Sequence, residues 1–363
     1  MNNILIKTSK QSGVSLIEIM IALIIGMILT AGAIQIFISS KATYRLESAL
    51  SRMQETGRFI VDTMAKEIRM AGYNGCSSRG TIETNTIADN PPPASINADD
   101  ALLGYQATGT NTWSPSLPSS MTVAMYDIGG DATKDLVSGT DVVLIQRADS
   151  CGASVSGNWD VTNANVQVSY PNGCGFAQNQ VVMVTDCSTA DVFALGNNPS
   201  GSGNLQTLNH STNNNTGNFL GKNYGPESQI FVYRSNIFFI APDDNGEPAF
   251  YLASWAPSDS NTTITAADYD ILELADGVQD MQILYGVDNA GGDDYADNYL
   301  TADAVTDWNQ VRSVRVNLLL QSADRITEEP RSFTFNGAEA NTSNDRRLRM
   351  LFSDTITLRN RLQ

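Results

Sequence analysis

Histidine is almost absent from this chain, because His210 is the only one in 363 residues. Catalytic schemes that need a histidine base therefore have a single candidate, and it lies in a stretch rich in Asn, Gly and Ser. The sequence also lacks GxSxG, HExxH and a glycine-rich phosphate loop that leads into a helix. Its Asp and Glu residues are too numerous for two of them to stand out as a glycosidase pair. These absences predict no catalytic residue and a protein that is not an enzyme.

Positive charge is scarce as well. The chain has 22 Lys and Arg against 39 Asp and Glu, which gives a net charge of −17. Such a surface repels the phosphates of nucleic acids, so DNA and RNA are excluded as partners.

Cysteine is limited to four residues, and they are Cys76, Cys151, Cys174 and Cys187. No two of them have the close CxxC spacing of a zinc site, so we expect disulfide bonds. Three pairings are open. Cys174 and Cys187 flank a short strand-like run, which favours a local bond between them and leaves Cys76 to pair with Cys151.

The N-terminal region has a long stretch without charge. Lys7 and Lys10 are the only charges before Glu18, and none follows from Ile19 to Ile38. About 20 apolar residues span a bilayer, and the positive flank places residues 1–13 in the cytoplasm and the rest outside. A secretory signal cut after Ala33 is the alternative, although apolar residues continue directly beyond that position.

The helical pattern then continues without a break. Apolar residues recur at steps of three and four, at Leu46, Leu50, Met53, Gly57, Ile60, Met64, Ile68 and Ala71. This predicts one helix from about Ser15 to Ala71, roughly 85 Å long at 1.5 Å per residue. The helix is apolar all round over residues 14–38 and amphipathic over residues 39–72.

The remaining residues, 73–363, predict a β-rich head. Apolar runs that are typical of strands lie at residues 141–146, 166–170, 181–185, 230–240, 249–254, 278–287 and 311–322. They do not alternate with helices, so we expect an α+β fold in which an antiparallel sheet packs on the amphipathic half of the helix. Residues 85–120 and 196–228 have the composition of loop insertions.

One acidic stretch is a candidate metal site. Asp288, Asp293, Asp294 and Asp297 surround a Gly-Gly pair and could offer oxygen ligands to calcium. The spacing is not that of an EF-hand, and the alternative is a solvated acidic loop. We therefore expect no cofactor, and calcium is the one exception that the sequence allows. An arginine cluster near the C-terminus could pair with this loop or with a neighbouring subunit, or form an ordinary basic face.

Several motifs resemble one known family. Gly13-Val14-Ser15-Leu16-Ile17-Glu18 resembles the leader end and mature start of type IV pilins and of their type II secretion relatives, with Val14 where Phe or Met is more usual. The segments AKEIRMAGYNGC (65–76), VRSVRVNLLLQS (311–322) and RRLRMLFSDTITLRNRL (346–362) resemble PilW-type minor pilins. The resemblance covers both ends of the chain.

The resemblance implies a pilin-like fold and a structural function. Residues 1–13 would be a leader that a prepilin peptidase removes after Gly13, with methylation of the Val14 amine. Glu18 would set subunit register by pairing with that amine on a neighbour. The protein would sit in the inner membrane by one pass, with its head outside, and then in the pilus fibre on the cell surface.

The implied partners are other minor pilins, the major pilin, the inner-membrane assembly platform and a tip adhesin. Its role would be to prime type IV pilus assembly in or near the pilus tip. Two alternatives remain: a pseudopilin of type II secretion, and an extracytoplasmic binding protein that is anchored or cleaved after Ala33.

Overall fold

The structure is a computed structural model of the chain. It describes residues 13–75, 82–89, 101–126, 128, 131, 133–257, 264–289, 292–329, 333–335, 338–340 and 345–361. The predicted leader up to residue 12, Cys76 and part of the predicted 85–120 loop lie outside these residues. The chain divides into two compact units, residues 1–52 and residues 53–363.

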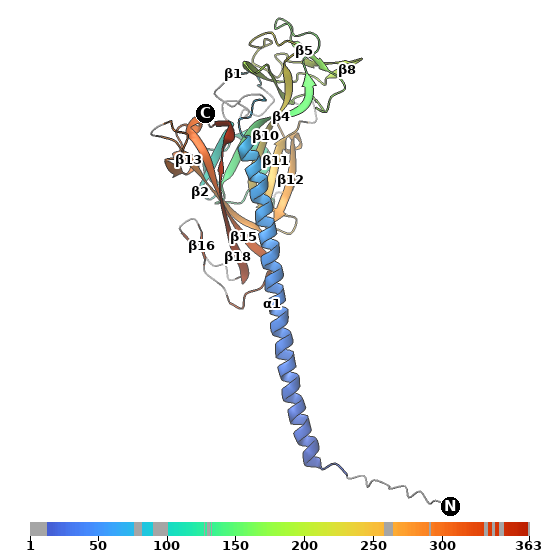
Figure 1. Ribbon diagram of the computed structural model, residues 1–363, viewed down its shortest axis with the longest axis vertical. Helices are drawn as coiled ribbons and strands as arrows, with labels where there is room; N and C mark the ends of the chain where they lie inside the picture. The colour runs from blue at the N-terminus through green and yellow to red at the C-terminus, as the bar shows by residue number, and fades with distance from the viewer. Residues whose placement is uncertain are drawn as a thin grey trace, which may run out of the picture. The chain divides into compact units, whose positions relative to one another are not determined.

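The predicted long helix is confirmed. Helix α1 spans Leu16–Met70, 55 residues, without interruption (Figure 1). It ends where Gly72 adopts a left-handed backbone with φ of 72°, which glycine tolerates without strain. The N–H of Tyr73 bonds the Met70 carbonyl and the N–H of Gly72 bonds the Gln146 carbonyl, so the helix end is tied to a strand of the head.

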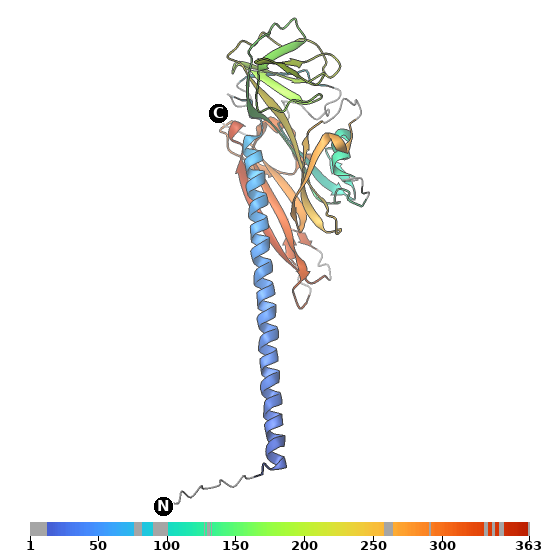
Figure 2. The same ribbon diagram turned by 90° about the vertical axis from the view of Figure 1, so that its right-hand side faces the viewer.

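The largest sheet of the unit 53–363 has nine strands and belongs to the head drawn in Figure 2. Its strands are β1 (Glu83–Thr86), β2 (Leu102–Gly109), β3 (Thr112–Ser114), β4 (Val142–Ser154), β6 (Val181–Thr185), β7 (Thr189–Ala194), β10 (Gln229–Pro242), β11 (Pro248–Trp255) and β12 (Tyr269–Asp276). Strands pair in the order β1-β7-β6-β10-β4-β2-β3. In addition, β11 pairs with residues 236–242 of β10, and β12 pairs with β11. The expected antiparallel pairing holds except between β1 and β7, which run parallel.

A second, antiparallel sheet has the order β14-β13-β15-β18. Its strands are β13 (Val278–Val287), β14 (Asn298–Leu300), β15 (Val311–Arg325) and β18 (Arg347–Thr357). Smaller elements are β5 (Asn165–Ser169), β8 (Ser200–Ser202), β9 (Leu205–Asn209), β16 (Phe333–Phe335), β17 (Ala338–Ala340), α2 (Ser119–Met125), η2 (Ala266–Asp268), η3 (Ala302–Ala304), η4 (Trp308–Gln310) and η5 (Arg359–Arg361).

The C-terminal part of α1 is the centre of one hydrophobic core. Met53, Ile60, Met64, Ala65 and Ile68 are buried against both sheets, where they join side chains of β10, β11, β13, β15 and β18. Burying such side chains contributes about 1.5–3 kcal/mol each. Gly57 has a packing reason, because a Cβ there would collide with the ring of Phe352 in β18. The amphipathic prediction is thus confirmed from Met53 onward, whereas Leu46 is exposed.

The prediction of loops at 85–120 and 196–228 is wrong for part of each segment. Strand β2 lies in the first and has Leu102 and Tyr105 buried, and strands β8 and β9 lie in the second. In the second segment, the side chains of buried asparagines make hydrogen bonds to backbone groups that a neighbouring strand would otherwise pair with. Asn215 bonds the N–H and the carbonyl of Ala194, and Asn214 bonds the carbonyl of Leu195. The polar composition of this segment therefore reflects side chains whose hydrogen bonds hold the fold together.

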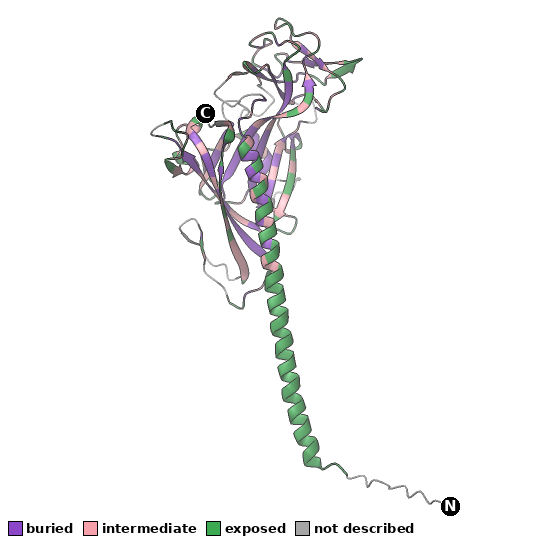
Figure 3. Cartoon of the chain, in the orientation of Figure 1, coloured by how far each residue is buried: buried purple, intermediate pink, exposed green. Residues whose placement is uncertain are grey.

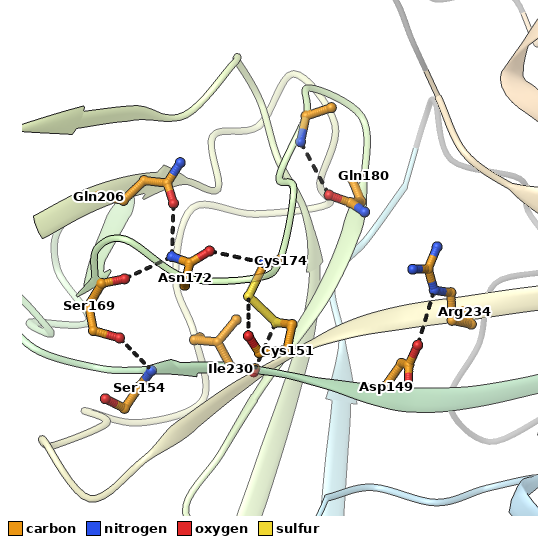
Figure 4. Close-up of a disulfide and its surroundings, with 11 residues drawn as sticks. Asp149, Cys151, Ser154, Ser169, Asn172, Cys174, Gln180, Gln206, Ile230 and Arg234 are labelled. Carbon is orange, nitrogen blue, oxygen red and sulfur yellow. Dashed lines mark hydrogen bonds and ion pairs between the residues drawn. A yellow bond between two sulfur atoms is a disulfide. The ribbon is translucent and has the colours of Figure 1, made fainter.

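The expected cysteine pairing is also wrong. Cys151 in β4 is bonded to Cys174, with a Cα–Cα distance of 4.8 Å (Figure 4). Strand β6 lies between Cys174 and Cys187, and five extended residues hold its ends roughly 16 Å apart. The chain instead folds back after β4, where the Ser154 N–H bonds the Ser169 hydroxyl, and this reversal brings Cys174 to Cys151. Cys187 is disulfide-bonded too.

Candidate functional site

The start of helix α1 places the residues of the predicted processing site on an exposed segment. Gly13 has no neighbouring atoms where a Cβ would stand, and Val14 is 70% exposed. The Glu18 carboxylate accepts a hydrogen bond from the Ser15 N–H at 2.9 Å. This is one half of a capping box, and a negative charge is favourable at a helix N-terminus. Glu18 is therefore held within one turn of Val14.

The helix that follows has an apolar surface that the chain does not cover. Every residue from Gly13 to Ser48 is exposed, as the green ribbon of α1 shows (Figure 3). The exposed large side chains are Leu16, Ile17, Ile19, Met20, Ile21, Leu23, Ile24, Ile25, Met27, Ile28, Leu29, Ile34, Ile36, Phe37 and Ile38. By length and composition α1 can cross a membrane. A continuous apolar surface of this extent is an interaction surface for lipid or for other helices.

A buried ion pair joins the other end of α1 to the large sheet. Glu67 accepts two hydrogen bonds from the Arg147 guanidinium, at 2.9 and 3.1 Å, and one from Asn236 Nδ2 at 2.9 Å. Arg147 also lies 3.1 Å from Asp149. The pair fixes the rotation of the helix on strands β4 and β10. Sequence reasoning missed it, although Glu67 lies three and seven residues after Met64 and Ile60, which places it on the apolar face.

A second buried carboxylate joins the two sheets. Asp141 accepts hydrogen bonds from the Ala107 N–H in β2 at 2.9 Å and from the Ile283 N–H in β13 at 2.8 Å. Burial raises the pKa of Asp141 to about 7, against the lowering effect of these two bonds, and the carboxylates of Asp280 and Asp303 add to the rise. Asp141 is thus a structural group that titrates near neutral pH.

Three of the four predicted calcium ligands, Asp288, Asp294 and Asp297, make contacts within the head. Asp288 accepts from the N–H groups of Gly292 and Asp294, and Arg312 lies 3.6 Å from Asp288 and 3.1 Å from Asp294. Asp297 accepts from the Asn289 N–H at 2.8 Å. Within the described part of the chain, no group of three or more His, Cys, Asp or Glu side chains is placed to hold a metal ion. Arg312 places one positive charge beside Asp288 and Asp294.

The C-terminal arginines pair within the head. Arg347 makes a bidentate bond to Glu247, at 2.6 and 2.7 Å, and Arg349 bonds Asp345 at 2.7 Å. The sequence left two partners open for the arginine cluster, the acidic loop and a neighbouring subunit. The contacts of Arg347 and Arg349 favour neither of them. His210, the only histidine, packs edge-to-face on Phe193 with ring centres 5.2 Å apart. Burial lowers its pKa to about 4, so it is a neutral core residue at pH 7.

Comparison with known proteins supports the predicted family resemblance at both ends of the chain. Residues 237–360 match the family described as Type IV Pilus-assembly protein W, and residues 8–34 match the prokaryotic N-terminal methylation motif. No curated protein and no solved structure matches the chain. The matches confirm the resemblance to PilW-type minor pilins, and the long helix with its β-rich head confirms the pilin-like α+β arrangement. They identify a type IV pilus-related, pilin-like protein.

Proposed function

We propose that this protein is a minor pilin that helps prime type IV pilus assembly and lies in or near the pilus tip. The observation that carries the proposal is the exposed apolar helix with Glu18 in its first turn. An apolar surface of that length needs a bilayer before assembly and neighbouring helices afterwards. The role is structural rather than catalytic, as in pilin-family domains.

Processing comes first in the proposed sequence of events. A prepilin peptidase cuts after Gly13 on the cytoplasmic side, and the new amine of Val14 is methylated. The exposed backbone around Gly13, without a side chain, lets the peptidase approach closely. The protein then stays in the inner membrane by a single pass, with its head outside the cytoplasm, until it enters the fibre.

Glu18 acts after cleavage. The carboxylate can keep its bond to the Ser15 N–H and still accept from the Val14 ammonium of a neighbouring subunit, because each carboxylate has two acceptor oxygens. An ammonium left unpaired in a bundle of apolar helices is costly, so subunits settle where the pair forms. The partners are other minor pilins, the major pilin, the inner-membrane assembly platform and a tip adhesin.

Two variants separate this role from helix capping. Glu18→Ala removes both the charge and the acceptor for Ser15, whereas Glu18→Gln keeps an acceptor oxygen and removes only the charge. Both proteins should be processed and stay in the membrane, yet co-purify poorly with other minor pilins and support few surface pili. A Glu18→Gln strain with normal pili would assign Glu18 to capping and overturn the register proposal.

Deletion of the chain tests the priming role itself. Surface pili should fall to a small fraction of the wild-type count, and the gene supplied in trans should restore them. A normal count would overturn the priming role. Loss of type II secretion with normal pili would favour the pseudopilin alternative.

A further inference from the structure

A cavity lies on the sheet β14-β13-β15-β18, next to the acidic loop. It has a volume of about 550 Å³, is partly open to solvent, and is bordered by residues of that loop, of β14, of the start of β15 and of the end of β18. Ligand pockets commonly measure 300–1,000 Å³. The residues that line it include Ser313, Thr355 and Thr357, and also Asp293, Tyr295 and Arg312.

One wall of the cavity is held in place by the sheet. Tyr299 lies over Gly286, where a Cβ would come within 2.8 Å of Ala296 and 3.1 Å of the Tyr299 ring. The Arg315 guanidinium stacks on that ring at 3.9 Å, and the Tyr299 and Ser313 hydroxyls are 3.1 Å apart. Residue 286 therefore has to be glycine for the ring to occupy this position.

The acidic loop is held as well. Arg312 pairs with Asp288 and Asp294 and donates to the Asn309 carbonyl at 2.8 Å. Residues 292–294 of the loop are therefore held by the buried carboxylate of Asp288 and by the Arg312 guanidinium. A cavity with fixed walls loses little conformational entropy when a ligand enters, which is the usual advantage of preorganisation.

Two residues of the cavity make few contacts that the fold needs. Tyr295 is 76% exposed. The hydrogen bond that the structure gives the Asp293 side chain is a local one, from the Tyr295 N–H at 3.1 Å. An aromatic ring in this position offers a flat apolar face at the rim. An exposed carboxylate beside it offers acceptor oxygens.

We propose that this cavity binds a neutral carbohydrate. Each sugar hydroxyl can both donate and accept a hydrogen bond. The lining residues offer carboxylates that accept, a guanidinium that donates, hydroxyls that can do either, and aromatic rings. The apolar face of a pyranose ring stacks on Tyr295. Among the lining residues two carboxylates, Asp293 and Asp294, outnumber the one guanidinium of Arg312, so phosphate, sulfate and carboxylate ligands are disfavoured by like-charge repulsion. The inference concerns the head and does not depend on the assembly role.

The test uses the full-length protein in a detergent without a sugar headgroup. The probe is an array of immobilised oligosaccharides of hexose and N-acetylhexosamine units, with sialylated and sulfated versions of each. Calorimetric titration with the best neutral glycan then compares variants. Tyr295→Ala and Asp293→Ala should weaken binding at least tenfold, and Tyr295→Phe should stay within threefold of wild type.

Matched controls lie away from the cavity. Phe219→Ala removes another exposed ring and Asp270→Asn removes another exposed carboxylate, and both should bind as wild type does. The proposal is overturned if no neutral glycan binds, if acidic versions bind better, or if Tyr295→Ala binds normally. It is also overturned if the cavity variants keep wild-type glycan binding and lose co-purification with other pilins, since the surface would then be a protein contact.

Discussion

Glu67→Ala should destabilise the head by about 3 kcal/mol. Removing one partner of a buried ion pair typically costs 3–5 kcal/mol, because the other charge stays buried without compensation. Arg147 would lose both bonds to Glu67, and Asn236 would lose its acceptor. Asp149 would remain 3.1 Å from the guanidinium, which places the expected loss at the low end. At 1.36 kcal/mol per factor of ten, this is about a 150-fold change in the folding equilibrium.

Guanidinium chloride unfolding of the full-length protein in detergent measures this loss. All four tryptophans lie within residues 53–363, so their fluorescence follows the head. Glu55→Ala, an exposed site on the same helix, should change the free energy of unfolding by less than about 0.5 kcal/mol. The double change Glu67→Leu with Arg147→Met should lie within about 1 kcal/mol of wild type. A loss below 1 kcal/mol for Glu67→Ala would refute the inference that this pair fixes α1 on the sheet.

Three further predictions concern the head. Below its unfolded pKa of 3.8, Asp141 is protonated in both the folded and the unfolded protein. Its pKa in the folded protein is raised to about 7, so between these two values the folded state holds a proton that the unfolded state has lost, and the free energy of unfolding falls as pH rises. Between pH 4 and 8 the free energy of unfolding should therefore fall less steeply with pH for Asp141→Asn than for wild type. The two pH-dependent changes should differ by on the order of 4 kcal/mol in equilibrium unfolding across the range. Replacing Cys151 and Cys174 by Ser, which opens a loop with a separation of 23 residues, should cost about 3 kcal/mol in denaturant unfolding. Arg312→Ala should lower the melting temperature by leaving Asp288 buried without its cation, and millimolar calcium should restore part of the loss only in this variant.

Sequence periodicity predicted the elements whose pattern is long and regular. The three- and four-residue spacing from Met53 to Ile68 reproduces the buried face of α1. The strand predicted at residues 311–322 likewise lies within β15, where the alternate residues Val314, Val316, Leu318 and Leu320 are buried. In both elements the repeat of the backbone decides which side chains meet the core, so local spacing is sufficient.

Features that depend on distant residues were not predictable in this way. Glu67 meets Arg147 across 80 positions, and nothing near either residue identifies its partner. The Cys151–Cys174 bond depends on how the chain reverses after β4, and sequence separation does not encode that reversal. The buried asparagines Asn214 and Asn215 have the composition of a loop, and only their hydrogen bonds show that they complete the fold.

The central claim is that this chain is processed as a pilin and carried into the fibre. Its most direct test is the N-terminal mass of the protein recovered from sheared surface pili. The account predicts a chain that begins with N-methylated Val14, thirteen residues shorter than the full sequence. A chain that begins at Ile34, or that is absent from purified pili while present in the envelope, would contradict it.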